Sequence, residues 1–242
     1  MSDFQVHIAS ALKDNYIFIL EHMGSEDCVV VDPTTADPVK HLMAQLNLQP
    51  KAIWNTHHHW DHVGGNIELK KTFKLEVFGF AKDQMRIPGI DHPLQENETF
   101  TWKDLEIRTL FAPGHTSGHL LFYIEKLNIL FSGDVLFGAG CGRLFEGTYS
   151  QMFHSLQTIK NLPDETLIYA AHEYTLANIE FANSVAPSKA LKTYQANAEN
   201  KRQHSLPTVP LNLGIEKSVN PFLTAKNESE FKDLRMKKDQ FR

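Results

Sequence analysis

The sequence predicts a layered α/β protein whose chain closes with a smaller helical module. Over about the first 170 residues, short runs of β-branched, aromatic and aliphatic residues alternate with Gly, Pro and Asp, a pattern typical of strands and turns. Two segments between these runs place apolar residues at helical spacing, and the chain beyond Tyr174 favours helices. With 242 residues, of which 42% are hydrophobic, the chain can bury a sizeable core.

Seven runs are expected as strands because they are rich in β-branched, aromatic and aliphatic side chains. Several are apolar throughout, which predicts burial on both faces of a sheet. The runs comprise residues 16–20, 28–31, 52–54, 105–111, 120–124, 129–131 and 167–170. The sequence leaves open which of these strands pair.

The segments expected as helices fall into two groups. Residues 37–48 and 150–160 carry apolar side chains on one face and should cover sheets. Residues 176–185, 189–204 and 228–238 are expected to form the helical module. The closing cations, among them Arg235 and Lys238, alternate with acidic residues, which predicts a solvated helix face. The change in character along the chain predicts two domains, residues 1–173 and 174–242.

Composition and charge narrow the possible partners and the compartment. The 24 Lys and Arg residues against 29 Asp and Glu residues give a net charge of −5, which disfavours nucleic acid as a partner. No apolar run approaches the ~20 residues of a membrane span, and residues 1–15 lack a signal-peptide pattern. Only Cys28 and Cys141 are present, which suits a reducing compartment. We therefore expect a cytoplasmic monomer that binds neither nucleic acid nor membranes.

A histidine-rich segment follows the expected strand 52–54. His57, His59, Asp61 and His62 supply three imidazoles and one carboxylate directly after a buried strand, where functional sites are commonly built. Neutral imidazole and ionised carboxylate are ligands for divalent cations, and a cation removes the cost of crowding them. The segment therefore predicts a metal site, and the alternative of a surface loop that happens to be rich in histidine is disfavoured.

Three further residues of ligand type follow other expected strands. His115 comes after strand 105–111, Asp134 after strand 129–131, and His172 after strand 167–170. Each residue alone is weak support, because histidines and Gly-Asp turns are common at strand ends. Their joint recurrence strengthens the prediction of a metal centre.

The order of these motifs resembles the metallo-β-lactamase superfamily. The pattern His-x-His-x-Asp-His is followed by Gly-His-Thr, then Gly-Asp, then a final His. Within the superfamily, residues 141–148 and 171–175 resemble the glyoxalase II branch, the hydroxyacylglutathione hydrolases of bacterial type, and the likeness continues to the closing residues 237–242. The resemblance implies a four-layer αββα sandwich, with residues 1–173 as the catalytic domain and residues 174–242 as a helical substrate-binding domain.

The resemblance also implies two divalent metal ions, with zinc expected first and iron or manganese as other possibilities. It places His57, His59 and His115 on one ion, Asp61, His62 and His172 on the other, and Asp134 between them. Asp61 and Asp134 are accordingly assigned as catalytic. Two cations lower the pKa of a shared water from about 15.7 toward about 7, so hydroxide is the expected nucleophile.

The implied reaction is hydrolysis of S-D-lactoylglutathione, or a related 2-hydroxyacyl glutathione, to glutathione and a 2-hydroxy acid, the last step of methylglyoxal detoxification. A thiolate leaves readily because the pKa of its thiol is about 8.5, so no strong general acid is needed. The resemblance points to Arg143, Phe145, Tyr174 and Lys226 for substrate binding, and an arginine can pair with a carboxylate of glutathione. The chain departs from the family at two positions. It has Phe145 where some members have Tyr, and it has Thr224 where a basic residue is usual.

The sequence also allows other functions to be considered. A glutathione persulfide dioxygenase with a single iron resembles this branch closely, and a nuclease of the superfamily is disfavoured by the acidic charge. A structural metal site would more often be a closed cage with thiolates. A covalent mechanism through Cys141 would leave the metal ligands without a purpose. Neighbours of the ligands are expected to lie outside the ligand set, namely His58, Trp60, His119 and Glu173.

Overall fold

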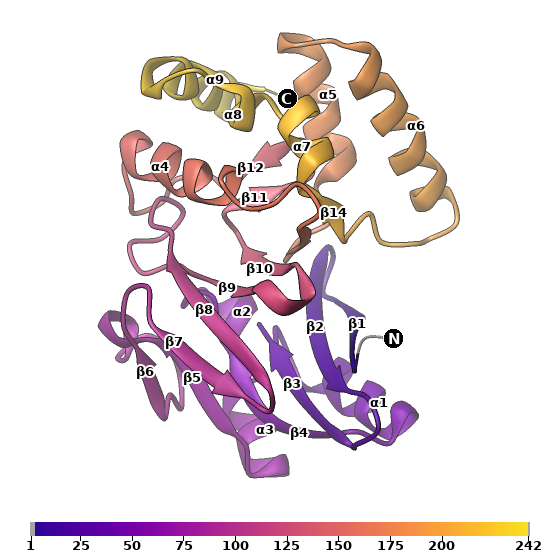
Figure 1. The fold of residues 1–242 in the computed structure, drawn as a ribbon, viewed down its shortest axis with the longest axis vertical. Helices are drawn as coiled ribbons and strands as arrows, with labels where there is room; N and C mark the ends of the chain where they lie inside the picture. The colour runs from indigo at the N-terminus through magenta and orange to yellow at the C-terminus, as the bar shows by residue number, and fades with distance from the viewer. Residues whose placement is uncertain (1–2, 242) are drawn as a thin grey trace. The chain divides into compact units, whose positions relative to one another are not determined.

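The computed structural model describes residues 3–241, which form two compact units (Figure 1). The first unit comprises the chain up to Leu110 together with Leu120–Leu127, and the second comprises Phe111–His119 together with the chain from Asn128 onward. Strands and helices alternate through most of the chain and helices dominate its end, so the predicted α/β class with C-terminal helices is confirmed. The domain boundary after residue 173 stays a prediction.

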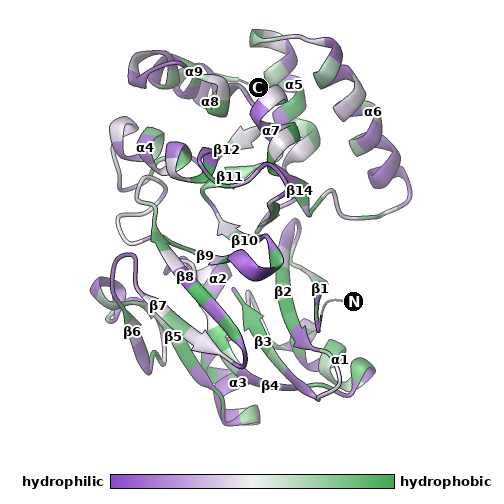
Figure 2. Ribbon diagram, viewed as in Figure 1, coloured by the Kyte–Doolittle hydropathy of each residue, from purple (hydrophilic) through white to green (hydrophobic). Residues whose placement is uncertain are grey.

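The first unit is built on a six-stranded sheet in which the strands follow chain order. The first three strands pair antiparallel and the remaining ones pair parallel. The strands are β1 (Phe4–Ala11), β2 (Asn15–His22), β3 (Asp27–Val31), β4 (Gln49–Trp54), β5 (Glu76–Phe80) and β6 (His92–Leu94). Strands β2 and β3 are almost wholly buried, which confirms the expectation from their composition. Figure 2 shows that β2 is largely hydrophobic.

Two helices cover one face of this sheet. Helix α1 (Ala36–Leu46) and helix α3 (Asn66–Phe73) contribute Val39, Met43 and Leu69 to an apolar core shared with the sheet. Helix α1 ends at Asn47, whose left-handed backbone (φ 55°) closes the helix. A single helical turn, α2 (Trp60–Val63), and the 3₁₀ turns η1 (Ala81–Asp83) and η2 (Glu125–Leu127) complete the helical segments of this unit.

The opposite face of the sheet packs against three further strands, β7 (Thr99–Trp102), β8 (Leu105–Phe111) and β9 (Leu120–Ile124). The Trp54 ring lies 5.4 Å from the ring of Phe100 and 5.5 Å from that of Phe122, centroid to centroid. These aromatic contacts account for the orientation of the two sheets, because large rings fill the roughly 10 Å between packed sheets. The first unit thus has a helix layer, a sheet and a second sheet.

In the second unit, strand β10 (Ile129–Gly133) runs parallel to β13 (Leu167–Ala170), which pairs antiparallel with β14 (Leu211–Asn212). A short hairpin, β11 (Leu136–Phe137) and β12 (Gly140–Cys141), follows β10 directly. Six helices complete the described part of the unit: α4 (Tyr149–Lys160), α5 (Thr175–Val185), α6 (Lys189–Gln203), α7 (Leu213–Val219), α8 (Pro221–Thr224) and α9 (Glu228–Gln240).

Local signals explain where several of these helices begin. Thr148 and Gln151 form a reciprocal capping box at α4, and Ser188 and Asn227 cap α6 and α9 with their side chains. Helices α5 and α6 lie side by side (Figure 1) and share an apolar cluster that includes Ile179 and Leu191. Within residues 3–241, every helix is too short or too polar to span a bilayer.

The structure differs from the sequence expectation at the closing cations. Arg235 is only 3% exposed, and its guanidinium donates to the carbonyl of Cys141 and lies over the ring of Phe222. Lys238 is partly buried, and burial lowers the pKa of its ammonium group. The expectation of a solvated helix face was therefore wrong for Arg235 and Lys238, because long cationic side chains can bury their stems and satisfy backbone carbonyls.

Candidate metal centre

In the first unit, Asp32 fixes the start of the histidine-rich loop. Its backbone is left-handed (φ 51°) where β3 ends, and the side chain is buried. One carboxylate oxygen accepts from the Thr56 amide at 2.8 Å, and the other accepts from the Thr56 hydroxyl at 2.7 Å and from His62 Nδ1 at 3.0 Å. With Nδ1 donating to Asp32, the lone pair of His62 is on Nε2, the form of imidazole that can ligate a metal.

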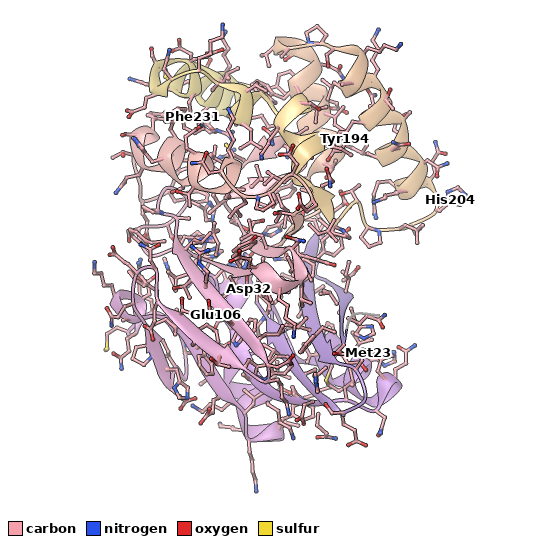
Figure 3. All side chains as sticks on the ribbon, in the orientation of Figure 1. Met23, Asp32, Glu106, Tyr194, His204 and Phe231 are labelled. Atoms are coloured by element: carbon pink, nitrogen blue, oxygen red, sulfur yellow. The ribbon has the colours of Figure 1, made fainter. Side chains whose placement is uncertain are left out.

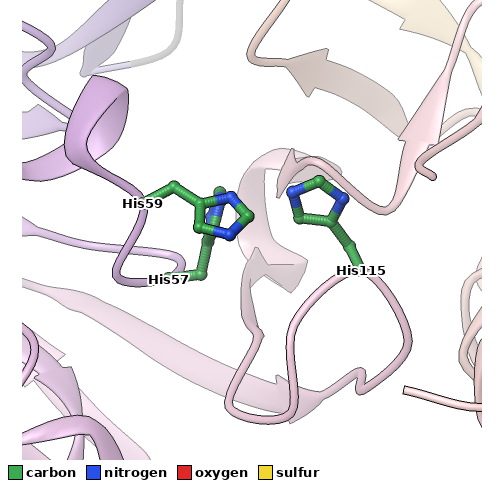
Figure 4. Close-up of side chains that lie close together, drawn as sticks. All are labelled: His57, His59 and His115. Atoms are coloured by element: carbon green, nitrogen blue, oxygen red, sulfur yellow. The ribbon is translucent and has the colours of Figure 1, made fainter. Parts of the chain in front are cut away.

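The Thr56 hydroxyl also orients the ring of His57. Because Thr56 Oγ1 donates to Asp32, its oxygen accepts from His57 Nδ1 at 3.0 Å. His57 Nε2 then lies 3.1 Å from His59 Nδ1, and Figure 4 shows these two rings side by side. Two imidazole nitrogens at this distance can share a proton or face a common cation.

Asp61 lies in the first turn of α2, where its carboxylate is held by Asn15. Asn15 Nδ2 donates to Asp61 Oδ2 at 3.0 Å, and the same oxygen lies 3.7 Å from His62 Nε2. The intervening residues point elsewhere: Trp60 is 68% exposed, and the His58 ring contacts Asp83 and Arg86. The first unit therefore brings together His57, His59, Asp61 and His62, four of the residues expected as metal ligands.

The second unit brings together the other three predicted ligands. His115 Nε2 lies 3.3 Å from Asp134 Oδ2, and His172 Nε2 lies 3.4 Å from Asp134 Oδ1. The two imidazoles thus face different oxygens of one buried carboxylate. Figure 4 draws the His115 ring on the loop that follows β8. A carboxylate whose two oxygens face separate ligand nitrogens has the donor arrangement expected of a bridging ligand.

Backbone groups hold these side chains in place. His115 Nδ1 donates to the carbonyl of Arg143 at 2.7 Å, which leaves the lone pair on Nε2. The Asp134 amide donates to His119 Nε2 at 3.1 Å, so His119 holds the backbone of Asp134. Gly142 is required here, because a Cβ at this position would lie 1.9 Å from the carbonyl oxygen of Asp134.

Each of the seven predicted residues offers an imidazole nitrogen or a carboxylate oxygen of the kind that binds a divalent cation. The donor chemistry therefore fits zinc, iron or manganese. Neither cysteine competes for the role of nucleophile. Burial raises the pKa of Cys141 to about 11 and that of Cys28 to about 12, so both thiols stay protonated at neutral pH.

The predicted substrate-binding residues differ in their surroundings. The Tyr174 ring stacks on His172 with a centroid distance of 4.8 Å and an angle of 1°, and the exposed Phe145 ring meets His115 edge-on at 5.2 Å. Arg143 is largely exposed and its Nε lies 3.6 Å from Asp239 Oδ1. Lys226 is exposed, and its amide donates to Glu230 Oε2 near the start of α9.

Sequence reasoning missed the residues that orient the ligands. Asp32 follows strand β3 just as the ligands follow their own strands, so its position at a strand end could have marked it. Glu173 was expected to be an ordinary neighbour of His172, whereas its carboxylate accepts from both the amide and the hydroxyl of Thr208. No sequence signal points to Thr208, because the two residues are far apart in the chain.

Comparisons with known proteins agree with the resemblance. Residues 13–172 match the metallo-beta-lactamase superfamily, and residues 173–241 match the family described as hydroxyacylglutathione hydrolase C-terminus. A hydroxyacylglutathione hydrolase of Bdellovibrio bacteriovorus is 44% identical over 239 residues, which cover 95% of each chain.

Solved structures show the same fold. The crystal structure of ETHE1 from Myxococcus xanthus is 22% identical, covers 96% of this chain and 89% of its own, and gives a TM-score of 0.72. The structure of TTHA1623 in a di-iron-bound form is 25% identical, covers 90% of this chain and 100% of its own, and gives a TM-score of 0.63. Because the two family matches run from residue 13 to residue 241 and the Bdellovibrio relative is similar along nearly its whole length, this chain belongs to the hydroxyacylglutathione hydrolase family of the metallo-β-lactamase superfamily.

Proposed function

We propose that this protein hydrolyses S-(2-hydroxyacyl)glutathione thioesters, S-D-lactoylglutathione above all, to glutathione and a 2-hydroxy acid such as D-lactate. This reaction would complete the detoxification of methylglyoxal. The observation that carries the proposal is the 44% identity to a relative named hydroxyacylglutathione hydrolase along 95% of the chain, together with the match of residues 173–241 to the family named for the same activity. The seven His and Asp residues that could hold metal ions support it.

Seven residues would hold two divalent ions: His57, His59 and His115 for one, Asp61, His62 and His172 for the other, and Asp134 for both. The two oxygens of Asp134, which face His115 and His172, support the bridging role. When bound, two such ions would supply a water of lowered pKa and positive charge for the oxyanion of the thioester. Zinc is the first candidate, while the di-iron form of TTHA1623 supports iron as another.

The chain's own residues orient these ligands and receive the substrate. Asp32 and the Arg143 carbonyl hold Nδ1 of His62 and His115, so both imidazoles present Nε2. The Arg143 guanidinium would pair with a carboxylate of glutathione, with Phe145, Tyr174 and Lys226 completing the binding site. The glutathione thiolate leaves without a dedicated acid, because the pKa of its thiol is about 8.5.

The proposed division of labour assigns residues 1–173 to catalysis and residues 174–242 to substrate binding. The change from one family match to the other between residues 172 and 173 supports this boundary. We further propose a cytoplasmic monomer. Two cysteines that are buried and unpaired agree with a reducing compartment.

The test is the loss of thioester absorbance of S-D-lactoylglutathione with purified protein, measured before chelation, after chelation and after metal is restored. Metals per chain are counted in the same samples. We expect chelator-sensitive hydrolysis with about two metals bound. Asp134→Ala should lose both metal and turnover, whereas His58→Ala, which changes a histidine outside the ligand set, should keep both.

Two results would count against the proposal. Full metal loading without hydrolysis would reject the substrate class. A single iron per chain, with oxygen consumed on glutathione persulfide, would instead identify a persulfide dioxygenase. Full activity of Asp134→Ala would reject the bridging role while leaving the reaction itself in place.

A further inference from the structure

The last turns of helix α9 contact the segment that carries Arg143. Arg235 is nearly completely buried, and its Nη1 donates to the Cys141 carbonyl at 3.0 Å, two residues before Arg143. Its guanidinium lies over the Phe222 ring, 5.2 Å from the ring centroid. On its other side, Nη2 donates to Asp239 Oδ1 at 2.9 Å, one helical turn along α9.

Asp239 is shared between two guanidinium groups. The oxygen that accepts from Arg235 also lies 3.6 Å from Nε of Arg143. The guanidinium nitrogen of Arg143 nearest to Asp239 is Nε. The ion pair therefore forms on the Nε side of the group, and the far edge of the guanidinium carries the terminal nitrogens Nη1 and Nη2. Those two nitrogens form the edge of a guanidinium that binds a carboxylate in the end-on bidentate geometry. The Arg143 side chain is 62% exposed, so this edge is accessible to a ligand.

The end of α9 that carries Asp239 is itself held firmly. Lys238 donates to the carbonyl of Ala177 at 3.1 Å, and the Phe241 ring meets the Phe181 ring edge-on at 5.4 Å. Together with the buried Arg235, these contacts fix the last turn of α9 to helix α5 and to strand β12. Helix ends commonly fray, so anchoring on both sides of Asp239 gives its carboxylate a defined position.

We propose that Asp239 is a positioning residue for substrate recognition: it holds the flexible Arg143 side chain so that the terminal nitrogens face a carboxylate of the glutathione moiety. The inference rests on the proposed function and on the role given there to Arg143. An arginine held in its binding geometry loses less side-chain entropy when the ligand arrives. Asp239 therefore affects the binding of carboxylate-bearing thioesters and leaves the chemistry at the metal centre unchanged.

The test compares Asp239→Asn with the wild type on two thioesters, S-D-lactoylglutathione and the same molecule with both glutathione carboxylates esterified. We expect KM for the free acid to rise about threefold to fivefold, the range of a partly exposed ion pair, with kcat unchanged. The KM for the esterified thioester should not change. The matched control is Asp233→Asn, because Asp233 is an exposed acid on the same helix.

Two further measurements separate positioning from other roles. In an Arg143→Gln background, Asp239→Asn should have no additional effect on KM, and calorimetric binding of glutathione should weaken by the same factor as KM in the single variant. A fall in KM would show that Asp239 competes with the substrate and would overturn the proposal. Equal losses on both thioesters, accompanied by a lower melting temperature, would show a structural role and would also overturn it.

The outcomes also distinguish this inference from the proposed function. If the wild-type, metal-loaded protein hydrolyses neither thioester, the proposed function fails, and the glutathione-binding measurement still tests Asp239. If the wild type is active but Arg143→Gln leaves KM unchanged, the hydrolase assignment stands and the positioning role of Asp239 is refuted.

Discussion

Replacing Glu216 by Gln is expected to remove a pH-dependent part of the stability of the second unit. Glu216 lies on α7 with no exposed surface. Its carboxylate accepts from the Tyr194 hydroxyl at 2.5 Å, the Ala139 amide at 2.9 Å and Asn220 Nδ2 at 3.1 Å. Figure 3 marks Tyr194 on α6. One buried carboxylate therefore ties α6, α7 and the β11–β12 hairpin together.

The magnitude follows from the pKa of this group. Burial raises the pKa of Glu216 from 4.5 to about 7, an effect only partly offset by the hydrogen bonds it accepts. The folded state thus binds the proton more tightly than the unfolded chain does, so the contribution to stability is complete below pH 4.5 and is lost as pH rises through about 7. A difference of about 2.5 pKa units at about 1.4 kcal/mol per unit gives a loss of ~3 kcal/mol.

Urea unfolding between pH 4.5 and 8.5 measures the pH-dependent loss of unfolding free energy that Glu216 causes. The free energy of unfolding of the wild type should fall relative to that of Glu216→Gln by ~3 kcal/mol from the lowest to the highest pH, because Gln cannot ionise. Both proteins are studied at one metal concentration, so that protonation of the metal ligands contributes equally. Glu165→Gln, at an exposed site, should follow the wild type throughout. Parallel pH profiles for the wild type and Glu216→Gln would refute the reasoning.

Three further predictions concern the metal centre and the core. Gly142→Ala places a Cβ 1.9 Å from the Asp134 carbonyl oxygen, so we expect the unfolding free energy to fall by at least about 1–3 kcal/mol and the metal content to fall as well. An unchanged unfolding free energy and metal content would show that the backbone shifts to make room for the Cβ. Asp32→Asn, which tolerates the left-handed backbone, should weaken metal binding about 10- to 100-fold in a chelator competition, and wild-type affinity would argue against its orienting role. Trp54→Ala should destabilise the protein by about 3–5 kcal/mol in urea unfolding, since the ring is fully buried against Phe100 and Phe122, and a loss below 1 kcal/mol would contradict that packing.

Much of the strand pattern could be predicted from the sequence. Strands β2, β3, β9 and β10 each contain a continuous apolar run, and such runs are recognisable locally because burial on both faces of a sheet favours apolar side chains. The strands that were missed lack that signal. Strand β1 is buried only at its two ends and partly or fully exposed between them, and β6 has only three residues, one of them a proline.

The ligand types were also readable in the chain. His57, His115, Asp134 and His172 each follow a buried strand, so their chemistry and their place at strand ends are both local properties. The arrangement around the Asp134 carboxylate is not a local property. That Asp134 presents separate oxygens to His115 and His172 depends on how the strands and loops of the second unit pack.

The sequence by itself therefore determined the fold class, most of the helices and the set of candidate metal ligands, because periodicity, composition and strand ends are local. Only the tertiary structure decided which buried polar groups contact one another. Asp32 orients His62, Arg235 is buried against Cys141, and Glu216 is shared by Tyr194 and Asn220. A buried polar group must find its partner wherever the packing places one, and these partners lie from 4 to 94 residues away in the chain.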